Sequence, residues 1–242
     1  MKYMGSKSRI ASTLVPVVNS IIQDSGLQQY VEPFVGGANV IDKIISPSRV
    51  GFDNQKYLIA LYQNISEVPN LPTNCSREHY VDVKSSYRLA DRRYPDWYVG
   101  AIGFLASYNG RFFDGGYSGV VRTKAGTIRD YYYEAKSNLI KQIPNLGNIQ
   151  FECADYRELA LTKSVIYCDP PYEGVKQYGS SRGFNHPEFW DWARTQRDAG
   201  NVVLVSEHQA PPDFKLLLEI NVNRTIDNTK RVKATERLFR LG

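Results

Sequence analysis

The first 65 residues alternate short apolar runs with segments of helical spacing, and this alternation constrains the fold more than any other feature of the sequence. Residues 29–32 and 49–52 are the apolar runs, and residues 6–22, 39–45 and 56–64 have the spacing of helices. Strands and helices in this alternating order are typical of parallel sheets built from βαβ units. We therefore predict an α/β fold with a mostly parallel sheet and helices on both faces.

The middle of the chain follows a different pattern. Helical spacing occurs over 81–89 and 96–106, and Asn109-Gly110 is a strong tight-turn signal. We predict that residues 66–135 are an insertion, part helical and part hairpin, in an α/β domain formed by the residues on either side of it.

From residue 148 the parallel-sheet pattern returns. Residues 149–153, 164–168 and 202–205 are apolar enough for buried strands, and 187–199 has helical spacing. Further expectations are that Pro16 kinks or divides the first helix, a short helix at 214–218, and closing strands at 221–226 and 237–241.

Composition excludes several classes of protein. The chain has 242 residues, 42% of them hydrophobic, and can bury a sizeable core. It has no apolar run near the roughly 18 residues that span a membrane, and its N-terminus lacks the apolar stretch of a signal peptide. Cys75, Cys153 and Cys168 are too scattered for disulfides or a zinc site. We expect a soluble intracellular protein that works without a metal.

The charge balance is compatible with a nucleic-acid partner but does not demonstrate one. The formal net charge is +5, and several of the 17 tyrosines lie beside Arg or Lys. This mixture suits a surface that stacks on bases and neutralises phosphates, and it also occurs on ordinary aromatic-rich surfaces.

The segment Asp169-Pro170-Pro171-Tyr172 is the most informative part of the sequence. It directly follows the predicted strand 164–168, at the carboxyl end where open α/β sheets bind their ligands. The two prolines remove two amide donors and fix two φ angles, which stiffens the turn. The alternative is a loop that only terminates the strand.

These four residues suit chemistry at a nucleobase amine, which is a poor nucleophile because its lone pair is delocalised into the ring. The Asp169 carboxylate and the Pro170 carbonyl are two acceptors that can draw the nitrogen toward a tetrahedral geometry. Tyr172 offers a ring on which an extruded base can stack. The carboxylate also favours the cation that forms when a methyl group arrives.

Two further segments have the features of a nucleotide site. Gly36 and Gly37 lie between a predicted strand and a helical segment, where backbone can approach a ligand closely. Asp53 ends the next strand, where an acidic residue often binds ribose hydroxyls, although an Asx-turn is the alternative. The segment from Lys2 to Lys7 lacks P-loop spacing and by itself indicates a solvated N-terminus.

In this order, the three segments resemble the Dam-like, alpha-group DNA adenine N6-methyltransferases. That family carries "K-W/Y-x-G-x-K", then "E-P-F-x-G", then a target-recognition insertion and "D-P-P-Y", and the resemblance covers essentially the whole chain. It implies a Rossmann-like S-adenosylmethionine-dependent methyltransferase fold, with a catalytic cofactor-binding domain at 1–65 and 136–242 and a target-recognition domain at 66–135. The family's Gly-Ala-Gly turn is Gly36-Gly37-Ala38 here.

The resemblance also implies roles for individual residues. Asp169, Pro170, Pro171 and Tyr172 would be catalytic. The residues implied to contact the cofactor are Tyr3 and Lys7, then Phe34, Gly36 and Gly37 at its methionine end, Asp53 at the ribose, Asp155 near its adenine, and Asp169.

Residues 106–113 resemble the family's DNA-contacting segment "N-R-Y/S-x-N-G". The implied DNA contacts are Tyr108, Asn109, Arg111, Phe112, Arg122 and Lys124. Arg111 would supply a cation for phosphate or a guanine edge, and Phe112 a ring that wedges into the base stack. The alternative for Phe112 is packing within the insertion.

We therefore expect a site-specific enzyme that transfers a methyl group from S-adenosylmethionine to the N6 amine of adenine in double-stranded DNA, by base flipping. It would act as a monomer or weak dimer in the cytoplasm of a bacterial or phage-infected cell. Alternatives left open are methylation of N4-cytosine or RNA adenine, and a catalytically silent DNA-binding module of the same fold.

Overall fold

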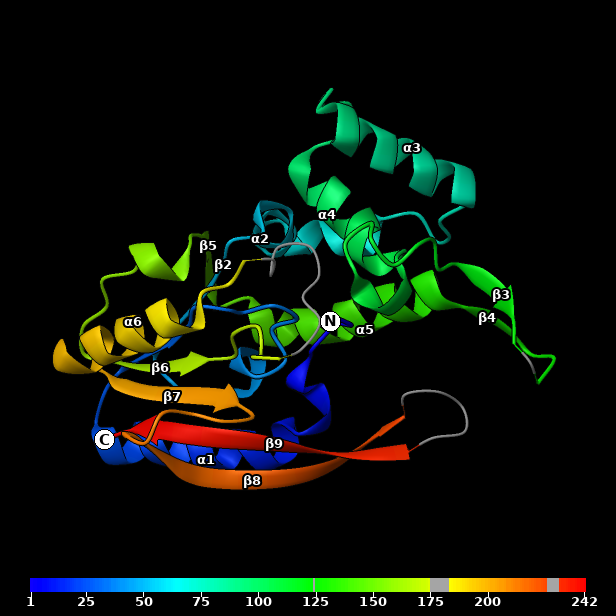
Figure 1. Ribbon diagram of the computed structural model, residues 1–242. Coiled ribbons are helices and arrows are strands. Elements are labelled where there is room, and N and C mark those ends of the chain that lie inside the picture. Colours follow the sequence, from blue (N-terminus) through cyan, green and yellow to red (C-terminus); the bar gives the residue numbers. More distant parts are fainter. Residues whose placement is uncertain (124, 175–182, 226–230) are drawn as a thin grey trace. The chain divides into compact units, whose positions relative to one another are not determined.

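The computed structural model describes residues 1–123, 125–174, 183–225 and 231–242 and divides into two compact units (Figure 1). Unit 1 comprises Met1–Ser6, Gly36–Asp42 and Gln55–Cys153, and unit 2 comprises Lys7–Val35, Lys43–Asn54 and Ala154–Gly242. The predicted insertion, 66–135, lies wholly within unit 1, which extends beyond it at both ends; the domain boundaries themselves stay a prediction.

Among the described residues, seven strands form the main sheet, in the order β5-β2-β1-β6-β7-β9-β8. They are β1 (Gln29–Glu32), β2 (Ser48–Asp53), β5 (Gln150–Cys153), β6 (Ser164–Cys168), β7 (Val202–Glu207), β8 (Phe214–Thr225) and β9 (Arg231–Leu241). β1 runs parallel to β2 and β6, and β6 runs parallel to β7, whereas β9 is antiparallel to both β7 and β8. The predicted α/β fold with a mostly parallel sheet is confirmed.

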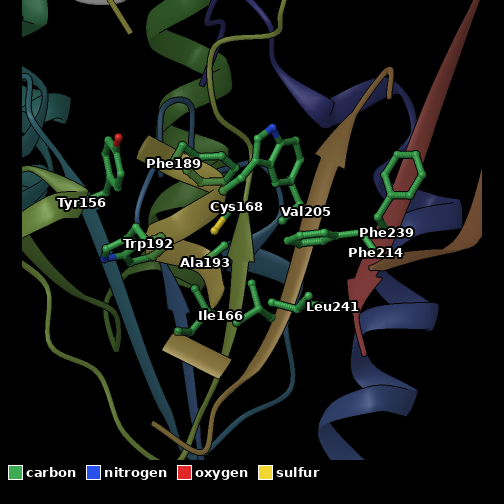
Figure 2. Packing of buried hydrophobic residues seen from close by; sticks show 12 residues of the cluster. Tyr156, Ile166, Cys168, Phe189, Trp192, Ala193, Val205, Phe214, Phe239 and Leu241 are labelled. Atoms are coloured by element: carbon green, nitrogen blue, oxygen red, sulfur yellow. The ribbon is translucent and has the colours of Figure 1, made fainter. Parts of the chain in front are cut away.

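In unit 2, helices cover both faces of this sheet (Figure 1). Phe189 and Ala193 of α6 (His186–Asp198) pack against Ile166 in one apolar cluster (Figure 2). On the opposite face, Leu14 of α1 (Ala11–Ser25) and Leu238 lie at the same tightly packed place. Apolar side chains on both faces explain why β6 is buried at every position.

Unit 1 is built mainly from helices and one hairpin. They are α2 (Lys56–Gln63), α3 (Arg77–Leu89), α4 (Asp96–Leu105) and α5 (Tyr131–Leu146), with β3 (Val120–Arg122) pairing antiparallel to β4 (Ile128–Asp130). Short 3-10 turns complete the chain: η1 (Lys7–Arg9), η2 (Ile41–Lys43), η3 (Ile65–Asn70), η4 (Tyr108–Gly110) and η5 (Tyr156–Glu158). Across the described ranges, no helix is long and apolar enough to cross a membrane.

Two local predictions are wrong, and one of two alternatives for Pro16 is excluded. The expected helix at 214–218 is the start of β8, because Phe214 and the residues after it pair with β9. The expected helix at 39–45 is only the turn η2. Its polar side chains make tertiary contacts instead of facing solvent from a helix: the Asn39 amide donates to Met1 O, and Asp42 accepts from Gln142. Of the two effects expected of Pro16, division of α1 does not occur, since Pro16 lies on the exposed side of the helix and the Ser12 carbonyl that loses its hydrogen bond is open to water.

Two features of unit 1 differ from the expectation for the middle of the chain. The hairpin lies at β3 and β4, and Asn109-Gly110 instead forms η4, in which both residues have positive φ (56° and 64°). The long helix α5 was not predicted. Its sequence does carry the signals, since Asp130 caps Tyr133 N–H and buried side chains such as Leu139 recur at helical spacing.

The packing of α2 against α4 gives a stability prediction at Gly100. A Cβ added there would lie 2.1 Å from the backbone oxygen of Tyr57, which cannot move without displacing α2. We expect Gly100→Ala to lower the free energy of unfolding by about 2–4 kcal/mol, measured by urea denaturation. Gly147→Ala is the control: that position has open space and φ −60°, so we expect no loss of stability. Equal stability of the two variants would contradict the close approach.

Candidate active site

Acidic side chains gather at one edge of the sheet in unit 2. β2, β1, β6 and β7 are parallel neighbours, so their carboxyl ends share an edge. Glu32, Asp53 and Glu207 end their strands there, and Asp169 directly follows β6. The first three are at most 8% exposed, so the sheet presents several buried carboxyl groups at the place where such folds bind ligands.

The Asp169 carboxylate has a direct cationic partner within unit 2. The Lys7 ammonium lies 2.7 Å from Asp169 Oδ1 and 4.6 Å from the centre of the Tyr172 ring. Lys7 precedes α1 on the turn η1, where the Ile10 N–H donates to its backbone carbonyl. The structure therefore brings together three of the predicted site residues from two distant parts of the sequence.

Burial dominates the electrostatics of this cluster. Burial raises the pKa of Asp169, and the Lys7 ammonium beside it works in the opposite direction. The pKa of Tyr172 is raised well above its usual value, mainly by burial and next by the negative charge of Asp169. The hydroxyl of Tyr172 therefore stays protonated and donates to Glu236 Oε2 at 2.9 Å.

In unit 1, the predicted glycine turn is in contact with the N-terminal segment. The Tyr3 ring lies against Gly36, where an added Cβ would be 3.0 Å from Tyr3 Cε1, and Tyr3 also contacts the Phe104 ring. Gly36 has φ 46°, and its carbonyl accepts from the Tyr62 hydroxyl at 2.7 Å. Ala38 is fully buried and also has a positive φ (51°), so a residue other than glycine adopts the left-handed conformation in this turn.

The other predicted cofactor residues lie in unit 2. Phe34 packs against Tyr156 and Phe189, and Asp53 is buried at the end of β2. Asp155 forms an ion pair with Arg157 at 2.8 Å and caps the turn η5 by accepting its backbone N–H. The capping role of Asp155 explains its position without excluding contact with a ligand.

Comparison with known proteins decides the family. A family model described as "D12 class N6 adenine-specific DNA methyltransferase" matches residues 3–211, which include the three sequence segments discussed above except for Lys2 at the start of the first.

This chain belongs to that family.

Two relatives named DNA adenine methylase support the assignment. They come from the Classical Ogawa O395 and El Tor Inaba N16961 strains of Vibrio cholerae serotype O1. Each is 26% identical to this D12-class methyltransferase over 235 residues, covering 82% of this chain and 81% of the relative. The predicted resemblance to adenine N6-methyltransferases is therefore confirmed.

The residues predicted to contact DNA lie in unit 1 of this D12-class methyltransferase. Tyr108 is 55% exposed, Asn109 takes the left-handed conformation, and Arg111 is half-buried with its Nε donating to Met4 Sδ. Arg122 is exposed on β3. Lys124 lies outside the described residues.

Phe112 packs in an aromatic cluster, and its contact with DNA stays a prediction. Its ring is half-buried and stacks on Tyr57 at 5.3 Å between centres, with further contacts to Tyr87, Phe104 and Phe113. An added Cβ at Gly103 would lie 2.4 Å from this ring. A wedge into DNA would require Phe112 to leave this aromatic cluster.

Three residues of the cluster around Asp169 were not predicted. Glu207 accepts the backbone N–H of Glu173, directly after the motif, and also that of His208. The His208 ring meets the Tyr172 ring edge-on at 4.8 Å, and Glu236 accepts from Tyr172. Glu207 follows an apolar strand and was therefore detectable. Glu236 lies in a polar stretch with no distinguishing pattern.

Glu207 gives a prediction for the pH dependence of stability. Burial raises its pKa to about 7, and the residue is 2% exposed. Because the pKa of this acid is higher in the folded than in the unfolded protein, the free energy of unfolding is greater at low pH and falls as pH rises from about 4.5 to about 7. We expect the loss from Glu207 to approach roughly 3 kcal/mol across this window.

Urea unfolding at pH 4.5 and 7.5 tests this prediction. In Glu207→Gln the free energy of unfolding should fall less between the two pH values than in the wild type, because glutamine has no proton to release at position 207. Glu219→Gln is the control, since that carboxylate is 45% exposed in an ion pair with Arg237. If the stability of Glu207→Gln depends on pH as strongly as that of the wild type, the interpretation is wrong.

Proposed function

We propose that this D12-class methyltransferase transfers a methyl group from S-adenosylmethionine to N6 of an adenine that it extrudes from duplex DNA. The observation that carries the proposal is the contact of the Lys7 ammonium with both Asp169 and Tyr172. A donor nitrogen already lies against the carboxylate and the ring that would receive the target amine and the target base.

The residues present fit the cofactor. Acidic Asp53 at the end of β2 suits ribose hydroxyls, and in unit 1 Gly36 and Gly37 leave no room for a Cβ beside Tyr3. We assign cofactor contacts to the eight residues inferred from the sequence: Tyr3, Lys7, Phe34, Gly36, Gly37, Asp53, Asp155 and Asp169. When bound, S-adenosylmethionine would supply a methyl group that leaves its sulfonium sulphur, with the bonding electrons staying on sulphur.

Asp169 would act on the target amine in two ways. Its carboxylate accepts an N6–H hydrogen bond, and with the Pro170 carbonyl it draws the nitrogen lone pair out of conjugation with the ring. The N6 lone pair then forms the bond to the methyl carbon, and the nitrogen gains positive charge. The adjacent carboxylate stabilises this charge. The raised pKa of Asp169 also favours uptake of the proton that the nitrogen must then lose.

The rigid turn and Tyr172 would position the base. Pro170 and Pro171 fix the backbone between the acceptor and the ring. Tyr172 is held by its hydroxyl on Glu236 and by the edge of His208, so the orientation of its ring is set before the base arrives. Extrusion costs a few kcal/mol of lost stacking and pairing, which phosphate contacts from Arg111 and Arg122 in unit 1 would help to offset.

The test is transfer of labelled methyl groups from S-adenosylmethionine to duplex DNA, followed by digestion and identification of the labelled nucleoside. We expect N6-methyladenine. Label in N4-methylcytosine, or label only in RNA, would move the substrate assignment to those bases. Cofactor binding without transfer to any of these substrates would favour a catalytically silent DNA-binding protein.

Cofactor binding itself has a separate measurement. Asp53→Ala should weaken the binding of S-adenosylmethionine by about 10-fold or more, because a buried carboxylate hydrogen-bonded to two hydroxyls contributes about 1.5–3 kcal/mol. Asp24→Ala, which removes an exposed carboxylate on α1, is the control and should bind like the wild type. Unchanged affinity in Asp53→Ala would remove Asp53 from the site.

A further inference from the structure

We propose that Glu236 is a positioning residue that receives the Lys7 ammonium when the target amine displaces it from Asp169. This inference rests on the proposed function, since it concerns what the protein must do with Lys7 when a base enters the site. It assigns a role in methyl transfer to a residue of β9, far from the sequence motifs.

The geometry begins with Lys7 between two carboxylates. Its ammonium lies 2.7 Å from Asp169 Oδ1 and 3.6 Å from Glu236 Oε2. The side chains are buried: Lys7 is 8% exposed and Glu236 is 9% exposed. The contact with Asp169 is the shorter one, so Asp169 is the main anionic partner of Lys7 in this structure.

The proposed substrate needs both contacts that Lys7 now makes. The target amine must donate to Asp169, and the base must stack on the Tyr172 ring, over which the ammonium lies at 4.6 Å. An amine that donates to Asp169 Oδ1, with its base stacked on the face of the Tyr172 ring that the ammonium covers, needs the place that Lys7 fills, so Lys7 has to move. An ammonium in a buried place is strongly disfavoured without an anionic partner, so it must move toward a carboxylate.

Glu236 is suited to be that carboxylate. Closing a gap of 3.6 Å to a hydrogen bond requires only a rotation near the end of the lysine side chain. Glu236 is also fixed in place, because its Oε2 accepts from the Tyr172 hydroxyl and its strand position is opposite Ile220. Glu207 also feels the charge of Lys7, but its two oxygens already accept backbone N–H groups from Glu173 and His208.

Two contacts therefore make Glu236 part of one positioning unit with Lys7. Through Tyr172 it orients the ring on which the base would stack, and through Lys7 it frees Asp169 for the amine. Without its negative charge, Lys7 would stay on Asp169 and compete with the target. The expected defect is in the chemical step after DNA has bound, rather than in DNA binding.

The experiment measures kcat and KM for DNA in Glu236→Gln, which keeps the shape and an acceptor for Tyr172 but removes the charge. We expect kcat to fall by about 10- to 100-fold, the effect of losing one charge-assisted contact, with KM for DNA changed by less than about threefold. Glu219→Gln on β8 is the matched control and should keep wild-type kcat. Thermal unfolding shows whether each variant is folded.

A double-mutant cycle with Lys7→Met separates this role from a structural one. With no ammonium to accommodate, Glu236→Gln should change kcat by less than about threefold in the Lys7→Met background. The same large fall in both backgrounds, or wild-type kcat in Glu236→Gln, overturns the proposal. If Glu236→Gln does not fold, Glu236→Thr, which also removes the charge, is used in the cycle: a larger fall in kcat with Lys7 present than in the Lys7→Met background supports the proposal, and equal falls in both backgrounds overturn it.

The wild-type protein, measured in the same assay, distinguishes the two levels of inference. Failure of the wild type to methylate adenine overturns the proposed function and this inference with it. Methylation by the wild type, with additive effects in the cycle, overturns only the role of Glu236.

Discussion

Asp169→Asn is expected to lower the rate of methyl transfer to DNA by about 10²- to 10³-fold while the protein stays folded. The amide keeps the shape of the side chain but cannot stabilise positive charge on the target nitrogen or take up its proton. Burial already raises the pKa of Asp169, so the ionised carboxylate is held at a cost to the fold. Removing the charge should therefore reduce activity far more than stability.

Single-turnover methylation at saturating cofactor and DNA measures this effect, with melting temperature as the check on folding. Asp198→Asn is the matched control, because that carboxylate is 66% exposed in a surface pair with Arg197. An Asp169→Asn variant with more than about a tenth of wild-type activity would mean that another group acts on the amine.

Tyr172→Ala is expected to reduce methyl transfer by about 10- to 100-fold, because stacking of a base on an aromatic ring contributes about 1–3 kcal/mol. Tyr172→Phe keeps the ring and loses only the hydroxyl bond to Glu236, so we expect a fall of no more than about 10-fold. The order wild type, Phe, Ala is the signature of a stacking role.

Two measurements guard this interpretation. Tyr172 is buried, so Tyr172→Ala also loses packing, and its melting temperature has to be measured at the assay conditions. Tyr133→Ala removes a tyrosine that is 54% exposed on α5 and serves as the control for ring loss. If the Phe variant is as inactive as the Ala variant, the hydroxyl rather than the ring face carries the function of Tyr172.

The parallel part of the sheet and the turn after β6 were predictable because their signals are local. The turn Asp169-Pro170-Pro171-Tyr172 is placed by the apolar strand directly before it and stiffened by its own two prolines, so residues adjacent in sequence determine both properties. The same holds for Asp53 at the end of β2 and for α6, which begins with the Asn185 cap and a proline.

The rest depended on contacts distant in sequence. β8 starts with residues that fit a helix as well as a strand, and pairing with β9 decides between the two. Lys7 reaches Asp169 across 162 residues of chain, and Glu236 reaches Tyr172 across 64. Neither Lys7 nor Glu236 lies in a pattern that indicates a buried ion pair. Phe112 was ambiguous for the same reason, since its stacking partner Tyr57 lies on α2, 55 residues earlier in the chain.

The position of β9 has a consequence for the order in which the sheet is completed during synthesis. β9 lies between β7 and β8, although both of these strands leave the ribosome before it. Its backbone pairs with both neighbours, so β8 has to wait for β9 before it can join the sheet. Glu236 belongs to β9, so the nascent protein forms the hydrogen bond from the Tyr172 hydroxyl to Glu236 only when β9 inserts between β7 and β8.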